Sequence, residues 1–130
     1  MDALIKTKRM AAFLEDKLAG DITVLGLGDV SLMADTFILA TGRNPRQNRA
    51  LADYLTEEFS RQDERPLRVE GYREGGWILV DYGDVVVHLF TQDQRSFYNL
   101  EKLWADARLI SWQDIDEPES RTAGGPDQNR

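Results

Sequence analysis

The sequence contains no cysteine and a single histidine, His88, among its 130 residues. Without cysteine, the chain has no disulfide, no thiolate metal site and no cysteine nucleophile. One histidine also excludes a metal site built from several histidines of one chain. No apolar run reaches the roughly 18 residues that a membrane span requires, and the first residues lack the unbroken apolar core of a secretory signal. These absences favour a cytoplasmic protein held together by an ordinary hydrophobic core.

Basic residues are also scarce, since 16 Lys and Arg against 23 Asp and Glu give a net charge of −7. An acidic chain is badly placed to neutralise phosphates, so we expect no sequence-specific binding of nucleic acid. A basic protein surface is a better partner for an acidic chain than nucleic acid is. Residues 114–130 hold five acidic and two basic residues, which is −3 of the total. Because this segment is rich in Pro, Gly, Ser and charge, we predict one domain at 1–113 and an acidic, disordered tail at 114–130.

Hydrophobic periodicity predicts an α/β domain with a mixed sheet of about five strands and flanking helices, in the order α-β-β-α-β-β-β-α. The apolar strand at 36–41 is expected at the centre of the sheet, buried on both faces. The helix from Pro45 to about Gln62 should cross over to a parallel neighbour at 67–71. The other expected elements are helices at 3–19 (stopped by Gly20) and 94–104, a strand at 22–25, and a hairpin at 77–90.

The hairpin sequence WILVDYGDVVVHLF, residues 77–90, has two largely apolar faces. Gly83-Asp84 suits a two-residue turn with glycine first, which fixes the register. One face is then wholly apolar and is expected in the core: Ile78, Val80, Tyr82, Val85, Val87 and Leu89. The other face carries Trp77, Leu79, Asp81, Val86, His88 and Phe90. Burial of each large apolar side chain is worth ~1.5–3 kcal/mol, so this second face needs a cover, either a helix of the same chain or a partner.

Asp81 and His88 are the two polar residues on the second face. They lie diagonally across the hairpin, ~7–8 Å apart at their backbones, so their side chains can meet. A catalytic dyad would need a nucleophile, and neither a cysteine nor a hairpin serine is present. We therefore favour a hydrogen-bonded pair that shapes a contact surface.

Three other motifs have both a functional and a structural interpretation. Gly26 and Gly28 resemble the start of a phosphate loop, but no later glycine follows, so turn glycines are favoured. Asp81 and Asp84 suggest a metal pair, although a turn aspartate is the more common case. Residues 41–46 place amide donors and two arginines near a helix N-terminus, where an anion can bind. Simple capping by Asn44 is the favoured interpretation.

Three segments carry a family resemblance: ADTFILATG at 34–42, WILVDYGDVVVH at 77–88 and LEKLW at 100–104. Together with Arg46-Gln47, Ala52-Asp53, Glu70-Gly71 and Tyr98, they resemble the ribosomal silencing factor family, also called Iojap. The resemblance covers roughly residues 3–107. One departure is Arg43-Asn44, where the family usually has a polar pair such as Thr-Ser.

The resemblance implies a fold similar to nucleotidyltransferases, without catalytic activity, metal or cofactor. It also implies binding to the large ribosomal subunit through ribosomal protein L-fourteen, which blocks joining of the small subunit and lowers translation when nutrients are scarce. Members often form homodimers. The expected contact surface is the second hairpin face with two edge residues: Trp77, Leu79, Asp81, Val86, His88, Phe90, Tyr98 and Trp104. The alternative is a metal-dependent, nucleotidyltransferase-like enzyme acting on nucleotides, with Asp81 and Asp84 as metal carboxylates and phosphate held near Gly42.

Overall fold

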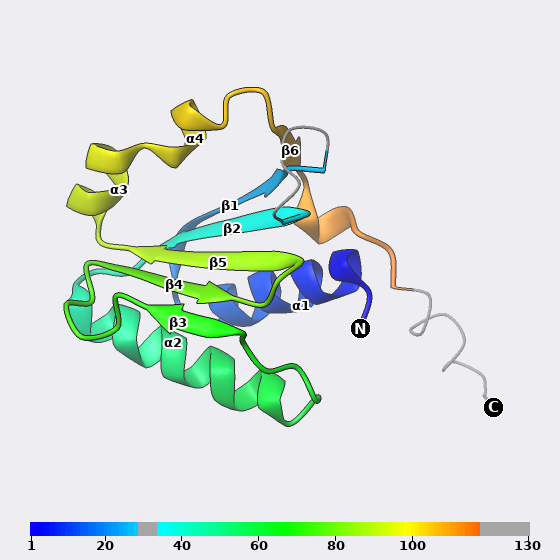
Figure 1. The fold of residues 1–130 in the computed structure, drawn as a ribbon, viewed down its shortest axis with the longest axis horizontal. Helices are drawn as coiled ribbons and strands as arrows, with labels where there is room; N and C mark the ends of the chain where they lie inside the picture. Colours follow the sequence, from blue (N-terminus) through cyan, green and yellow to red (C-terminus); the bar gives the residue numbers. More distant parts are fainter. Residues whose placement is uncertain (29–33, 118–130) are drawn as a thin grey trace.

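The computed structural model describes residues 1–28 and 34–117, which form an α/β fold around a six-stranded mixed sheet (Figure 1). The predicted fold class is confirmed. The helices are α1 (Ala3–Asp16), α2 (Pro45–Ser60), α3 (Gln92–Tyr98), α4 (Leu100–Leu103) and the 3-10 turn η1 (Trp112–Asp114). The strands are β1 (Gly20–Gly26), β2 (Thr36–Thr41), β3 (Arg68–Glu70), β4 (Trp77–Asp81), β5 (Val85–Phe90) and β6 (Arg108–Ile110). None of the described helices is long and apolar enough to cross a membrane.

The sheet has the strand order β3-β4-β5-β2-β1-β6, with β2 and β5 parallel and every other pair antiparallel. The central position of β2 is confirmed. The predicted parallel pairing of β2 with the strand at 67–71 is wrong, because β3 lies at the outer edge and pairs with β4. Its three residues are all exposed, so it lacks the apolar side chains of a central strand. The parallel neighbour of β2 is β5, and the unpredicted β6 forms the opposite edge.

The hairpin of β4 and β5 has the predicted register. Val80 lies opposite Val87 and Ile78 opposite Leu89, and Gly83 adopts φ 90° in the turn between them. All six residues of the wholly apolar face belong to the main core. Helices α1 and α2 complete that core on one side of the sheet (Figure 1), chiefly through their fully buried residues Met10, Leu14, Leu51, Leu55 and Phe59.

Two predicted helices end differently, and in both cases a left-handed residue is the reason. α1 ends at Asp16 rather than near residue 19, because Leu18 adopts φ 69°. The amides of Leu18 and Ala19 then bond the carbonyls of the last helical turn in a Schellman arrangement, and Gly20, the expected stop, begins β1 instead. The predicted helix at 94–104 is divided into α3 and α4 at Asn99, which has φ 47°.

The first part of the predicted tail contacts α1. Lys8 on α1 donates from Nζ to the carbonyl of Ile115 at 2.6 Å, and Arg9 pairs with Glu117 at 2.9 Å. Two residues of the predicted tail, Ile115 and Glu117, thus contact α1, and the predicted boundary between 113 and 114 stays a prediction. The rest of the predicted tail, 118–130, lies outside the described residues.

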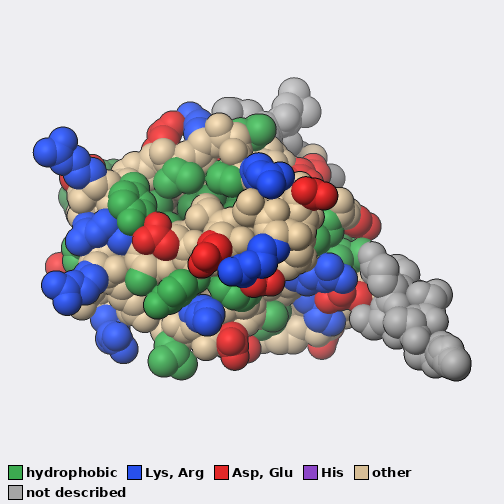
Figure 2. Space-filling model, turned by 90° about the horizontal axis from the view of Figure 1, so that it is seen from below, with side chains coloured by type: hydrophobic (Ala, Val, Ile, Leu, Met, Phe, Trp, Pro, Cys, Tyr) green, Lys and Arg blue, Asp and Glu red, His purple; other side chains and the backbone are tan. Residues whose placement is uncertain are grey.

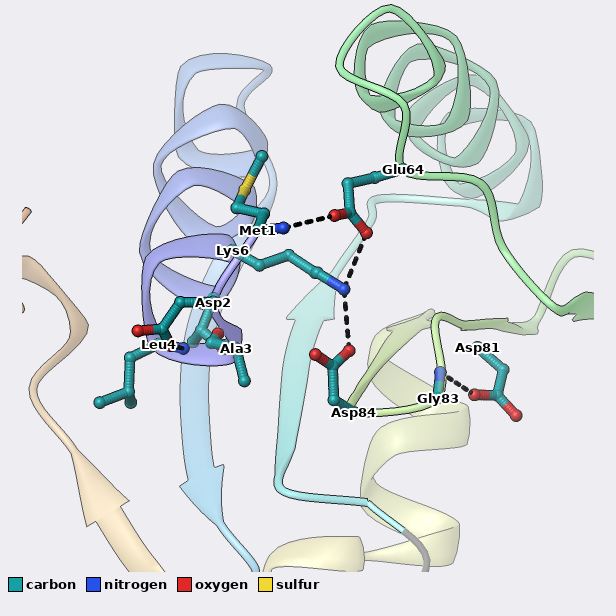
Figure 3. A network of polar contacts seen from close by, with 10 residues as sticks. Met1, Asp2, Ala3, Leu4, Lys6, Glu64, Asp81, Gly83 and Asp84 are labelled. Carbon is teal, nitrogen blue, oxygen red and sulfur yellow. Dashed lines mark hydrogen bonds and ion pairs between the residues drawn. The ribbon is translucent and has the colours of Figure 1, made fainter. Parts of the chain in front are cut away.

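Lys6 links three separate parts of the chain (Figure 3). Its ammonium lies 2.8 Å from a carboxylate oxygen of Glu64, just after α2, and 2.9 Å from one of Asp84, at the tip of the β4–β5 hairpin. The amine of Met1 also pairs with Glu64, at 3.2 Å. Because the Lys6 side chain is only 6% exposed, these contacts join both core helices to the hairpin in a place that water scarcely reaches.

The pKa values in this network are shifted in opposite directions. Burial disfavours the charged form of Lys6, but hydrogen bonds and charges of Glu64 and Asp84 outweigh burial and raise its pKa above 10.5. Burial likewise acts to raise the pKa of Glu64, but Lys6 and the N-terminal amine lower it below 4.5. The stability from Glu64 is therefore complete above pH 4.5 and is lost as the pH falls through its folded pKa. That from Lys6 is complete below pH 10.5 and is lost at higher pH.

We predict that Lys6→Met lowers the free energy of unfolding at pH 7 by roughly 2–3 kcal/mol, because it leaves partly buried carboxylates without their cation. Urea unfolding measures this loss. Lys102→Met is the control, since it removes the same charge from an exposed position and should change stability by less than ~0.5 kcal/mol. The difference between wild type and Lys6→Met should shrink as the pH falls below 4.5 and through the lowered pKa of Glu64, where this carboxylate becomes protonated. A loss that is independent of pH would contradict this account of the network.

Candidate functional site

The second hairpin face is covered partly by the chain itself. Val86 and Phe90 are buried in a second apolar cluster together with Leu39 of β2 and Leu100 of α4. Helices α3 and α4 lie on the side of the sheet opposite α1 and α2 (Figure 1). Cover by the chain's own helix, one of the two predicted alternatives, is thus confirmed over β5. It stops short of β4, where Trp77 and Leu79 remain half-buried.

A chain of aromatic rings, which we call the aromatic strip, runs along the boundary of this cover. It consists of Tyr98, Trp77, Phe37 and Trp104, with His88 between them. The Trp77 ring lies 4.6 Å from that of Tyr98 and 6.0 Å from that of His88, measured between centroids. Phe37 lies 4.5 Å from His88 and 5.7 Å from Trp104. Tyr98 is 46% exposed and the other three rings are half-buried, so each of the four presents part of its apolar surface to solvent.

His88 holds this strip together from beneath. It is 3% exposed, and its Nδ1 accepts a hydrogen bond from the indole Nε1–H of Trp77 at 3.0 Å. The neutral imidazole therefore carries its proton on Nε2, which has no partner within the described residues. Burial lowers the pKa of His88 to about 4, although the charge of Asp81 acts in the opposite direction. His88 is thus neutral at pH 7 and fixes the orientation of the Trp77 ring.

Asp81 does not pair with His88, so the predicted hydrogen bond between them is wrong. One carboxylate oxygen of Asp81 accepts from the amide of Gly83 at 2.7 Å (Figure 3), and the other accepts from Nε of Arg68 at 3.0 Å. The hairpin turn and the edge strand β3 supply donors closer than the imidazole. Asp84 faces Lys6 instead of Asp81. Within residues 1–28 and 34–117, no group of three His, Cys, Asp or Glu side chains could hold a metal ion.

The eight predicted contact residues divide into two sets. Val86, His88 and Phe90 lie beneath the surface, because α4 and the rings of Phe37 and Trp77 cover them. In the free chain these three side chains are therefore not accessible to a partner, and their predicted contact role stays a prediction. The other five reach the surface in whole or in part: Trp77, Leu79, Asp81, Tyr98 and Trp104.

Two further surface residues were not among the predicted contacts. Phe97 lies in the segment that was predicted as a single helix at 94–104. Because the chain turns at Asn99, Phe97 is 78% exposed, with its ring 5.0 Å from that of Tyr98. Phe37 was expected to be fully buried in the central strand, yet it joins the strip. The only local signal for the exposure of Phe97 is Asn99 itself, since asparagine tolerates the left-handed conformation.

Arg95 is a buried anchor that positions α3, and sequence reasoning missed it. Its guanidinium donates to the carbonyl of Asp21 at 2.6 Å and to the hydroxyls of Thr41 and Thr23 at 2.8 and 3.0 Å. It also pairs with Glu101 at 2.8 Å. These bonds fasten α3 to the ends of β1 and β2, which places Tyr98 against Trp77. Three of the four partners lie 54 to 74 residues away in the chain, so no local pattern could identify this arginine.

The motifs with a phosphate-binding alternative have structural roles. The side chain of Asn44 accepts from the amide of Gln47 at 2.8 Å, and that of Gln47 accepts from the amide of Arg43 at 2.6 Å. Capping of α2 is thus confirmed, and it occupies donors that an anion would need. Gly26 belongs to β1, paired with Thr36. Residues 29–33, which follow the second glycine of the motif, lie outside the described residues.

We predict that His88 stays neutral down to about pH 5, which NMR titration of its ring would show. Because unfolded His88 binds a proton at higher pH than the folded residue, stability should fall by about 2 kcal/mol between pH 7.5 and pH 5. His88→Gln should remove that part of the pH dependence in urea unfolding. A folded His88 that titrates near pH 6.5 would contradict the buried, neutral role.

Known proteins resemble this chain in sequence and in fold. The family model described as "Ribosomal silencing factor during starvation" matches residues 2–130, further than the 3–107 expected from motifs. Ribosomal silencing factor RsfS of Bacillus subtilis is 44% identical over 102 residues, 78% of this chain and 86% of that protein. The mouse protein "Mitochondrial assembly of ribosomal large subunit protein 1" is 29% identical over 98 residues, 73% of this chain and 43% of its own length. A crystal structure of a Chromobacterium violaceum protein matches with TM-score 0.78 and 30% identity, covering 94% of this chain and 100% of that one. The chain therefore belongs to the ribosomal silencing factor family.

Proposed function

We propose that this chain binds the large ribosomal subunit through ribosomal protein L-fourteen and thereby blocks joining of the small subunit. Translation would fall when nutrients are scarce, and the chain would act in the cytoplasm, either as a monomer or as a homodimer. The description of the family as a silencing factor during starvation supports this proposal. The name of the mouse relative, which refers to assembly of a large ribosomal subunit, supports the choice of subunit.

The observation that carries the proposal is the aromatic strip at the edge of a half-covered sheet. Aromatic side chains dominate the binding energy of protein interfaces when they enter a pocket of the partner. Tyr98 and Trp77 are held rigidly from below, by Arg95 through α3 and by His88 through its hydrogen bond. A rigid anchor loses little side-chain entropy on binding, which favours affinity.

The negative net charge of the chain is the second observation that supports the proposed partner. The partner is taken to be a basic ribosomal protein, and the chain carries −7. Asp81 lies on the same strand as Trp77, and both Asp81 and Glu70 accept hydrogen bonds from the guanidinium of Arg68. These carboxylates can meet basic groups at the rim of the interface, where complementary charge raises the association rate more than the affinity.

The proposed mechanism requires occupancy and no turnover. The chain would cover a surface of the large subunit that the small subunit also needs. No observation favours the alternative nucleotidyltransferase-like enzyme, because the two carboxylates assigned to its metal are engaged elsewhere, Asp81 with Gly83 and Arg68, and Asp84 with Lys6.

We predict that Tyr98→Ala weakens cosedimentation with isolated large subunits by roughly thirtyfold or more, the ~2 kcal/mol of an interface anchor. Its unfolding midpoint should change little, because the ring lies on the surface. Leu4→Ala is the control, since Leu4 is 47% exposed, close to the 46% of Tyr98, but belongs to α1 on the other side of the sheet. Equal effects of the two substitutions would contradict the assignment. Failure of the wild-type chain to pellet with large subunits would refute the proposed function itself.

Trp77→Ala should affect both stability and binding, because Trp77 is half-buried and bonded to His88. We expect a loss of stability of about 2–3 kcal/mol, below the ~3–5 kcal/mol for truncating a fully buried aromatic residue, because Trp77 is only half-buried. At low temperature, where the variant is still folded, large-subunit pelleting should remain strongly weakened. Thermal unfolding and pelleting on the same sample separate the two effects. Normal binding by the folded variant would remove Trp77 from the contact surface.

A further inference from the structure

One end of this acidic molecule is basic. The stretch 36–52 contains three arginines, Arg43, Arg46 and Arg49, and no carboxylate. Viewed from the side of α1 and α2, Lys and Arg side chains gather at the left end of the molecule, where α2 begins (Figure 2). Arg43 and Arg46 line one surface hollow together with Lys17 from the end of α1. Arg49 reaches the carbonyl of Arg73, in the turn between β3 and β4, at 3.2 Å. We call these five residues the basic end.

The cations of the basic end have no carboxylate partner among residues 1–28 and 34–117. Lys17 lies over the rings of Phe13 and Tyr54, and Arg49 bonds a carbonyl. Elsewhere most arginines are neutralised by ion pairs: Arg9, Arg61, Arg65, Arg68 and Arg95. A group of unpaired guanidinium groups in a chain of net charge −7 is therefore a local feature that total composition conceals.

The basic end adjoins the aromatic strip through the turn at 72–76. A Cβ atom placed on Gly75 would lie 2.7 Å from Nη1 of Arg49, so the turn rests directly on α2. The carbonyl of Gly76 accepts from the amide of Thr91, the N-cap of α3. Trp77 follows immediately in β4. A partner that covers the aromatic strip would therefore lie next to Arg49 and Arg73.

We propose that the basic end contacts the phosphate backbone of ribosomal RNA next to the ribosomal protein that the aromatic strip binds. This inference rests on the proposed function, because a ribosomal protein is embedded in RNA. Guanidinium groups match phosphate oxygens in a bidentate way. Because the contacts are to phosphate, they position the chain without reading RNA sequence. The expectation that an acidic chain neutralises no phosphates is thereby limited to its other surfaces.

The first test compares two double variants that each remove two positive charges, Arg43→Gln with Arg46→Gln and, as control, Arg61→Gln with Arg65→Gln. Pelleting with large subunits is measured over a salt series. Each lost phosphate contact should reduce the logarithmic salt slope by ~0.7–0.9. For the first variant this gives a slope shallower by ~1.4–1.8 and, at 0.1 M salt, binding roughly 25- to 60-fold weaker. The control should stay within about twofold of wild type. Equal losses in both variants, or an unchanged slope in the first, would overturn the inference.

The second test uses a fluorescently labelled 20-base-pair RNA duplex and no ribosome, so that it does not depend on the proposed function. At low salt, wild type should raise the anisotropy of the duplex, and the Arg43/Arg46 variant should bind at least fivefold more weakly. Tyr98→Ala should bind the duplex as wild type does. Absence of duplex binding by wild type, or binding to polyglutamate in its place, would overturn the inference. If wild type binds the duplex but does not pellet with large subunits, the proposed function fails while the RNA contact stands.

Discussion

The parallel pairing of β2 with β5 at the centre of the sheet is the constraint on which the rest of the structure depends. All six residues of β5 are buried, so apolar layers are needed on both faces of the sheet. Helices α1 and α2 supply one layer, and Lys6 fastens them to the tip of the hairpin. The short helices α3 and α4 supply the other, and Arg95 fixes α3 in place.

The candidate contact surface follows from the unequal size of these two layers. The layer of α1 and α2 extends across the sheet, whereas α3 and α4 together offer only 11 residues, seven and four. They cover β5 and leave Trp77 and Leu79 of β4 half-buried. Apolar side chains that the chain cannot cover gain burial free energy when a partner covers them. The under-covered strand and the proposed contact surface are thus the same physical feature.

The polar residues on the second face illustrate how similar groups can serve structure instead of chemistry. An aspartate and a histidine at diagonal positions suggested a pair, yet each has a nearer partner. His88 accepts from the indole of Trp77, and Asp81 accepts from Gly83 and Arg68. Burial keeps the histidine neutral, which suits a hydrogen-bond acceptor beneath an aromatic ring. These bonds restrict the Trp77 and Tyr98 rings, and restricted anchors suit the proposed action by occupying a surface.

The sequence by itself determined the α/β class, the central apolar strand and the hairpin register, because these depend on local periodicity and on a turn glycine, Gly83. The sequence also identified the family, because the motifs that carry the resemblance are contiguous in the chain. Tertiary structure decided the place of β3 at the edge, the break at Asn99, the anchoring by Arg95 and the basic end. The place of β3 and the anchoring by Arg95 depend on residues far apart in sequence, and the basic end depends on charges that folding brings together or leaves unpaired. The break depends on the left-handed conformation of Asn99, which its residue type permits but does not require. Amino-acid composition gives only the net charge of the whole chain, and hydrophobic periodicity reports only on residues that are close in sequence.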